Sequence, residues 1–141
     1  VLSGERNSND QICLEAVRML YKPTEPVLKR EIISFLETAS IKSNDIDLVL
    51  LGKSGNPVQD RITDEISNMH FAGSSIGLFK HLSGEYPTAS AFALWLAVRI
   101  IQKNHIPGSV VFRDTNRPVK SVLIYNPYFS THHSLILLRA C

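Results

Sequence analysis

The residues with the clearest chemical potential stand just before the most apolar segment of the chain. Lys80, Gly84 and Glu85 form a polar turn, and residues 91–98 are eight apolar residues in a row. A helix that is apolar on every side has to be covered on every side. The turn therefore places an ammonium and a carboxylate beside a buried helix N-terminus, where anionic ligands are favoured. We predict a candidate site here; the competing interpretation is an exposed ion pair of little energetic value.

A second candidate is the loop after residues 46–51, a short run that is apolar on both faces and typical of a central parallel strand. Ligands bind at the C-terminal ends of such strands, and the loop there holds Gly52 and Gly55. Two glycines at this spacing do not make a phosphate-binding motif, so an ordinary turn is the competing interpretation. Pro57 then begins a helix. We expect its inward-facing residues to be Ile62, Ile66 and Met69.

The histidines and cysteines give weaker signals. The five histidines lack convincing metal-ligand spacing, and the adjacent His132 and His133 would point to opposite faces of a strand. Cys13 is interpreted as a small buried residue within a helix, and Cys141 as a loose terminal residue. Two cysteines do not make a disulfide framework in a chain of this length. We expect no metal and no cofactor.

The composition indicates one globular domain. The chain has 141 residues, 44% of them hydrophobic and 20% charged, with a formal net charge of +2. Because lysines and arginines form no block, nucleic acid is disfavoured as a partner. No apolar run reaches the roughly 18 residues of a membrane span, and no signal peptide opens the chain. We expect a cytoplasmic protein.

The hydrophobic pattern predicts alternating helices and strands. Residues 3–10 are expected to be a loop in which Ser8, Asn9 and Asp10 offer caps to a helix ending at Lys22. Further helices are expected to begin near residues 24 and 57, and the apolar helix to end near Asn104. Strands are expected at residues 46–51, 75–79, 110–113, 119–125 and 134–138. The sequence thus predicts an α/β domain with a mixed, mostly parallel sheet of about five strands and helices on both faces.

Four stretches carry a family resemblance: IDLVLLGKSGNPVQD (residues 46–60), KHLSGEYPTASAFALWLA (80–97), HIPGSV (105–110) and YNPYFSTHHSLILL (125–138). Together, and in this order, they resemble the C-terminal half of β-ketoacyl-acyl carrier protein synthases, condensing enzymes of the thiolase fold. The resemblance runs from about Glu31 to the end of the chain. It implies a thiolase-like half domain as the single domain of residues 1–141.

The resemblance also implies a degenerate catalytic site. In the family, a cysteine from the N-terminal half carries the acyl chain, and two histidines donate hydrogen bonds to the malonyl thioester oxygen. A lysine beside them is held by a glutamate. Here the histidine positions fall on Gly52 and Glu85, the lysine remains as Lys80, and its glutamate partner falls on Leu94. Losing one oxyanion donor typically costs a factor of ~10²–10³ in rate, and an ionised Glu85 would repel an enolate.

The family's glycine-rich gating loop is replaced as well. Residues 127–130 stand in its place, so the backbone freedom of glycine is lost. Tyr128 and Phe129 are the candidate substrate contacts at this position.

These observations leave three hypotheses about function. The first is a non-catalytic ketosynthase-like domain of fatty acid or polyketide synthesis, similar to the chain-length-factor partner of an active ketosynthase. The second is an acyltransferase or condensing enzyme with altered chemistry that uses Glu85 and a cysteine from an N-terminal half. The third is a structural interaction module.

The predicted partners follow from these hypotheses. A ketosynthase subunit or the chain's own N-terminal half would cover the apolar helix in a homo- or heterodimer. An acyl carrier protein is a further candidate partner. The chain alone is expected to be inactive in condensation.

Overall fold

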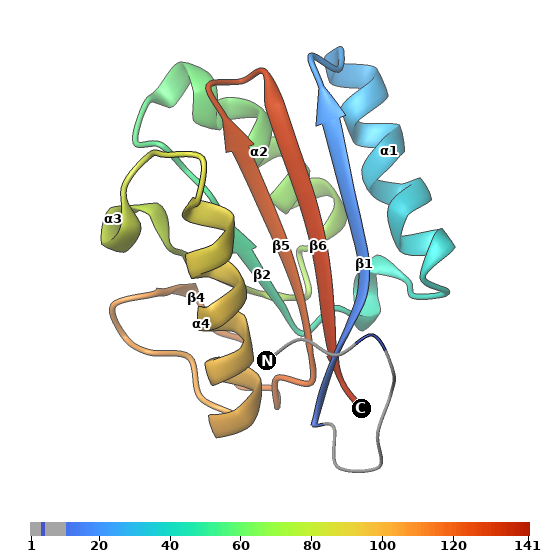
Figure 1. Cartoon of the computed structure of the whole chain (residues 1–141), viewed down its shortest axis with the longest axis vertical. Helices are drawn as coiled ribbons and strands as arrows, with labels where there is room; N and C mark the ends of the chain where they lie inside the picture. Colours follow the sequence, from blue (N-terminus) through green and yellow to red (C-terminus); the bar gives the residue numbers. More distant parts are fainter. Residues whose placement is uncertain (1–3, 5–10) are drawn as a thin grey trace.

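The computed structural model describes residue 4 and residues 11–141 and shows a single sheet with helices on both faces (Figure 1). The loop predicted for residues 3–10, with its capping residues Ser8, Asn9 and Asp10, lies outside the described residues apart from Gly4. The elements in chain order are β1 (Ile12–Tyr21), α1 (Glu25–Thr38), a 3₁₀ turn (Ser43–Asp45), β2 (Leu48–Leu51), α2 (Pro57–His70), β3 (Ser75–Leu78), α3 (Lys80–Ser83), α4 (Ala89–Lys103), β4 (Val111–Arg113), β5 (Ser121–Tyr128) and β6 (His132–Ala140).

Over the described residues the sheet has six strands in the order β1-β6-β5-β2-β3-β4, compared with the prediction of about five. β2 pairs in parallel with β3 and β5, whereas the other three neighbouring pairs are antiparallel. Since β1 and β5 both run antiparallel to β6, the strands β1, β2, β3 and β5 share one direction. The predicted mixed α/β architecture is confirmed. Most strands of the sheet run in the same direction, although only the pairs β2–β3 and β2–β5 are parallel neighbours.

β1 corrects the sequence-based expectation of a first helix. Its apolar residues fit a helical period, but in the structure the segment alternates between two faces of an edge strand. Ala16 and Leu20 pack against the core under α1, whereas Val17 and Met19 point to the opposite face and are exposed. Antiparallel pairing with β6 along most of the strand decides the outcome, because tertiary context overrides a local propensity.

The cysteine predictions were wrong for the same reason. Once β1 lies beside β6, Cys13 and Cys141 come together and form a disulfide with a Cα–Cα distance of 5.7 Å. The two residues are 128 positions apart, so only the strand pairing reveals their proximity. Cys141 also donates its backbone N–H to the carbonyl oxygen of Gln11 at 3.0 Å.

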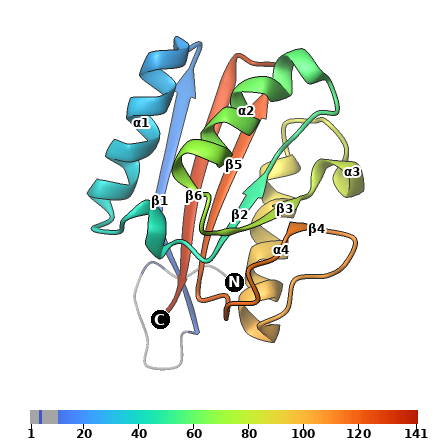
Figure 2. The same cartoon turned by 180° about the vertical axis from the view of Figure 1, so that it is seen from behind.

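Two hydrophobic cores lie on the two faces of the sheet. Val49 and Leu51 of β2 face α1 and α2, while Leu48 and Leu50 of the same strand face α4. Figures 1 and 2 show α1 and α2 together on one face and α4 on the other. The expectation that β2 is a central parallel strand, buried on both faces, is confirmed.

In α2, Ile66 is buried and Ile62 packs against the same core, as predicted, but Met69 is 63% exposed. The prediction for Met69 was wrong because the buried side of α2 runs through Asp60, Thr63, Ile66 and Ser67 and leaves residue 69 outside it.

Residues 80–101 divide into α3, a turn at residues 84–88, and α4. α4 ends as predicted, where Asn104 adopts a left-handed conformation with φ of 47°. The buried residues of α4 lie on one side of the helix: Ala89, Ala93, Leu96, Ala97 and Ile100. Trp95, by contrast, is 58% exposed. Among residue 4 and residues 11–141, therefore, α4 is fully buried only on the side that faces the sheet.

Candidate functional site

The structure brings the three candidate residues Gly52, Lys80 and Glu85 together. Gly52 follows β2, Lys80 begins α3 directly after β3, and Glu85 lies in the turn before α4. A Cβ atom placed on Gly52 would lie 3.0 Å from Lys80 Cε, and Lys80 Nζ lies 2.8 Å from each carboxylate oxygen of Glu85. The site therefore lies at the C-terminal ends of the parallel strands, as the sequence predicted.

Lys80 is a buried cation whose hydrogen-bonding groups are occupied. Its side chain is only 3% exposed, so the interpretation as an exposed ion pair is wrong for the lysine, although Glu85 retains 26% exposure. Besides both oxygens of Glu85, Nζ donates to the backbone carbonyl oxygen of Pro127. The three donors of the ammonium thus meet three acceptors, and the pair ties the turn before α4 to the end of β5.

Gly52 sits where a larger residue would not fit. A Cβ atom there would meet Asn126 Oδ1 at 2.5 Å and the ring of Phe79 at 3.1 Å, in addition to Lys80. The backbone of Gly52 is fixed by its N–H, which donates to the carbonyl oxygen of Tyr125 at 2.9 Å. The position therefore offers no side-chain donor.

Asn126 is a site residue that sequence reasoning missed. It is 4% exposed, its Nδ2 donates to Ser90 Oγ at 2.8 Å, and Ser90 Oγ lies 3.2 Å from Ser134 Oγ. Its Oδ1 is buried and has no hydrogen-bond partner among the described residues. The available signal was a polar residue directly after an apolar run; the predicted strand ends at residue 125, but β5 continues through Asn126 to Tyr128.

The loop between β2 and α2 satisfies its own polar groups. The buried carboxylate of Asp60 accepts hydrogen bonds from the backbone N–H groups of Ser54 at 2.8 Å and Gly55 at 2.9 Å. Asn56 caps α2 by accepting from the N–H of Val58 at 3.0 Å. The positive end of α2 is thus neutralised by acidic and amide oxygens of the chain itself.

A cleft of about 620 Å³ opens beside Lys80 and Glu85. The charged and titratable residues in its lining are Lys53, Asp60, Asp64, Lys80, His81 and Glu85. Lys53 Nζ lies 2.9 Å from Asp64 Oδ1, so the cleft has two lysine–carboxylate pairs on its walls. The cleft thus carries charges of both signs, two lysines and three carboxylates, in contrast to a cluster of one sign.

The turn between β5 and β6 carries the gating-loop candidates. Phe129 and Ser130 adopt positive φ values of 47° and 53°, a conformation that glycine adopts more readily. The rings of Tyr128 and Phe129 pack edge to face with centroids 4.5 Å apart, and Phe129 is 57% exposed. Two residues of the turn adopt the left-handed conformation although neither is glycine. We infer that the aromatic contact and the pairing of β5 with β6 stabilise this conformation.

A buried aromatic pair supports this turn from the α2 side. The hydroxyl of Tyr125 and Nδ1 of His133 are hydrogen-bonded at 2.9 Å. Burial lowers the pKa of His133 below its ordinary value of 6.5; a hydrogen bond with the Ser130 backbone opposes this shift, and the nearby His132 and Lys80 add to it. Burial raises the pKa of Tyr125. His132 is exposed and His133 is 3% exposed, which confirms that they point to opposite faces.

Leu94 lies on α4 and packs against the apolar core, so the lysine partner is Glu85 and not residue 94. In chemical terms, the groups that surround Lys80 in the described structure are acceptors: a carboxylate and a backbone carbonyl. Such a site neutralises a cation. Within the described part of the chain, it does not present the converging donors that a developing oxyanion requires.

Comparisons with known proteins show the fold. No protein-family model matches the chain, and no curated protein matches it either. Among solved structures it is similar to the ishigamide ketosynthase/chain length factor (15% identity, TM-score 0.71), covering 91% of this chain and 38% of that one. It is also similar to a β-ketoacyl synthase from Burkholderia phymatum (15% identity, TM-score 0.70, 91% and 37%).

A further likeness is to the oxazolomycin ketosynthase domain OzmH KS8 of Streptomyces albus (11% identity, TM-score 0.66, 91% and 44%). The chain spans less than half the length of each of these structures. The likenesses establish a ketosynthase-like thiolase fold. Among the described residues, no helix is long and apolar enough to cross a membrane.

Proposed function

We propose that this chain is a ketosynthase-like domain of fatty acid or polyketide biosynthesis that does not itself catalyse condensation. In this proposal it acts as the partner of an active ketosynthase subunit, in the manner of a chain length factor, with an acyl carrier protein as the source of the acyl chain. The fold supports the first part of the proposal, and the geometry around Lys80 supports the second.

The observation that carries the proposal is the engagement of Lys80 by acceptors. Decarboxylation of a malonyl thioester develops negative charge on the thioester oxygen, which needs hydrogen-bond donors to stabilise it. Here Glu85 places a carboxylate against the lysine, and Gly52 has neither a donor nor room for one. Each missing donor is expected to cost a factor of ~10²–10³ in rate.

The alternative in which Glu85 serves as a general acid or base gains no support from the geometry. Both of its oxygens accept hydrogen bonds from the Lys80 ammonium, so neither is free to exchange a proton with a substrate. Acylation of the chain remains a measurable outcome that would favour this alternative.

The surface beside α4 supports the proposed pairing. Val17 of β1 pairs with Ile136, which belongs to the core under α4, so Val17 and Met19 lie on the α4 side of the sheet. Val17 is 55% exposed and Met19 65% exposed, and Trp95 of α4 is exposed as well. Burying a large apolar side chain contributes ~1.5–3 kcal/mol, so covering this face would stabilise a complex. We place the ketosynthase subunit, or the chain's own N-terminal half, on this face.

Catalysis is tested by incubating the full chain with malonyl-acyl carrier protein and measuring carbon dioxide release and intact protein mass. An active ketosynthase is the positive control. We expect neither decarboxylation nor an acyl adduct from this chain. Decarboxylation, or an acylated chain, would overturn the non-catalytic part of the proposal.

Pairing is tested by co-expression with a ketosynthase and light scattering after size-exclusion chromatography. We expect a stable complex that is weakened by Met19→Glu and Trp95→Glu. Met69→Glu is the matched control, since Met69 is similarly exposed but lies on α2, on the opposite side of the sheet. A monomeric chain that forms no complex, or equal weakening by the control, would contradict the assignment of this face.

A further inference from the structure

The space beside Gly52 is filled from the neighbouring strand. A Cβ atom on Gly52 would come within 2.5 Å of Asn126 Oδ1, a distance that real Cβ atoms do not show. The same Cβ atom would lie 3.0 Å from Lys80 Cε and 3.1 Å from Phe79 Cζ, and these contacts are less close. Asn126 is therefore the main obstacle to any side chain at position 52.

The amide of Asn126 is held in this orientation. Its Nδ2 donates to Ser90 Oγ in the first turn of α4, and Ser134 Oγ lies beside Ser90 and also donates to the carbonyl oxygen of Asn126 at 3.4 Å. β5 itself is fixed between β2 and β6. Neither the side chain nor its backbone can readily move away from Gly52.

The position of the Asn126 amide oxygen is energetically unfavourable. Asn126 Oδ1 is buried without a partner among the described residues, and an unpartnered buried acceptor destabilises a fold. Hydrogen bonding therefore does not explain the position of the oxygen, and the observation that remains is the volume that it fills beside Gly52.

We infer that Asn126 is the plug of this site: its amide oxygen occupies the volume that a side chain at position 52 would need, and Gly52 and Asn126 form one complementary pair. The inference rests on the proposed function for its significance, because the plug keeps a second donor from facing Lys80. The closure of the site thus depends on a residue of β5 and not only on the glycine after β2.

A double-mutant cycle on thermal unfolding tests the pair. Gly52→Ala alone is expected to lower the Tm by at least about 5 °C or to prevent folding. Asn126→Ala, which removes an unpartnered acceptor, is expected to have the smaller effect, and combined with Gly52→Ala it should restore at least half of the loss. Asn126→Gln keeps an amide and should not rescue.

Gly77→Ala is the matched control for rescue. A Cβ atom on Gly77 would meet Leu50 at 2.8 Å and Val110 at 3.0 Å, with Asn126 not among its close contacts. Asn126→Ala should therefore leave the effect of Gly77→Ala unchanged. The pairing would be overturned if Gly52→Ala had no effect, or if the effects of Gly52→Ala and Asn126→Ala were simply additive. It would also be overturned if neither Gly52→Ala nor the Gly52→Ala/Asn126→Ala double variant folded.

A second measurement does not depend on stability. In the Gly52→His/Asn126→Ala variant, the new imidazole would face the Lys80 ammonium, which should lower its pKa by like-charge repulsion. Adding Lys80→Met should raise that pKa, as followed by NMR; an unchanged pKa would contradict the placement. These outcomes are independent of the carbon dioxide assay, so the plug and the non-catalytic proposal can fail separately.

Discussion

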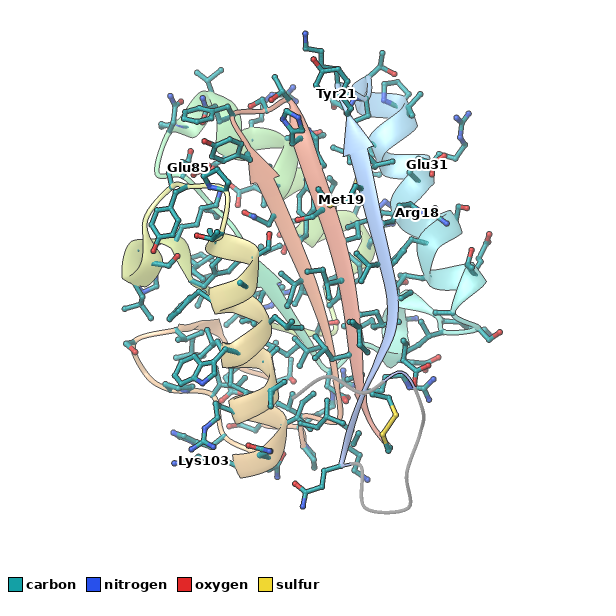
Figure 3. All side chains as sticks on the ribbon, in the orientation of Figure 1. Arg18, Met19, Tyr21, Glu31, Glu85 and Lys103 are labelled. Carbon is teal, nitrogen blue, oxygen red and sulfur yellow. A yellow bond between two sulfur atoms is a disulfide. The ribbon has the colours of Figure 1, made fainter. Side chains whose placement is uncertain are left out.

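Two cross-links tie the chain together at opposite ends of the sheet, and they differ in kind. At one end the Lys80–Glu85 pair joins the turn before α4 to the end of β5; at the other the Cys13–Cys141 disulfide joins β1 to the segment after β6 (Figure 3). The ionic link spans five residues of sequence, and the covalent link spans 128. The first holds a candidate site, and the second holds an edge strand.

The comparison shows what each link can contribute to stability. A covalent link acts mainly on the unfolded chain, by removing its conformational freedom, and gains with the length of the closed loop. A buried ion pair acts on the folded chain and becomes costly when one partner is removed, because the other is left unpaired. Breaking each link separately should therefore give effects of different origin and size.

Reducing the disulfide is expected to have the largest effect. Breaking Cys13–Cys141 with dithiothreitol, or by Cys13→Ser, should lower the free energy of unfolding by up to about 4 kcal/mol, because the bond closes most of the described chain. Urea denaturation with and without reductant measures this, and Cys13→Ser should be insensitive to reductant. An unchanged midpoint would show that β1 is held by strand pairing alone.

The same bond tests the predicted cytoplasmic location. Disulfides persist in oxidising compartments and are rare in the cytosol. Thiol alkylation of protein taken from its native cells, followed by mass measurement, distinguishes the two states. Free thiols would support the cytoplasmic prediction, and a bonded pair would count against it.

Lys80→Met is expected to cost about 3 kcal/mol, because it leaves a carboxylate and the carbonyl of Pro127 without their donor. Glu85→Gln should cost at least as much: an amide oxygen can still accept from Lys80, but the ammonium, which is only 3% exposed, is left without its counter-charge. Urea denaturation of the two variants measures both. If Lys80→Met left the free energy of unfolding unchanged, the Lys80–Glu85 pair would contribute no more than an exposed ion pair does.

The sequence predicted contacts that are local and missed those that need strand order. Lys80 and Glu85 share one turn, and β2 is apolar on both faces, so both were accessible to pattern reasoning. β1 has apolar residues that fit a helix and a strand equally well, and only its pairing with β6 decides between them. Missing β1 also meant missing the disulfide.

The site was predicted in the same partial way. By pattern alone, Gly52 and the Lys80–Glu85 turn were two separate candidates, and the family resemblance placed the three residues in one site, where the structure also has them. Asn126 could not, because its importance depends on a contact of less than 3 Å with the position of a missing side chain. That information exists only in the packing of β2 against β5.

Lowering the pH should reduce the free energy of unfolding, because His133 is buried at the end of the sheet that holds the candidate site. Burial lowers the pKa of this imidazole below 6.5, so the unfolded chain takes up a proton at a higher pH than the folded chain does. Stability should be fully retained above about pH 6.5, fall as the pH decreases from there, and level off below the folded pKa. The change should be smaller than the loss caused by Lys80→Met.

Urea midpoints between pH 8 and pH 4.5 measure the effect, and His133→Gln should reduce the slope. His70 also has a pKa lowered by burial and by Lys29, so His70→Gln is the control that removes the other contribution of the same sign. If only His70→Gln changed the slope, the acid sensitivity would belong to α2 and not to the site end.

The smallest effect is expected from the second ion pair of the cleft. Lys53 and Asp64 lie 2.9 Å apart, but the Asp64 side chain is 51% exposed, so water and salt screen the pair. Asp64→Asn should change the free energy of unfolding by no more than about 1 kcal/mol, and by less at high salt than at low salt. The same urea measurement that detects Lys80→Met sets the scale. A loss from Asp64→Asn as large as that from Lys80→Met would show that burial is not what distinguishes the two pairs, and the contrast between a buried ionic link and a solvated one would have to be abandoned.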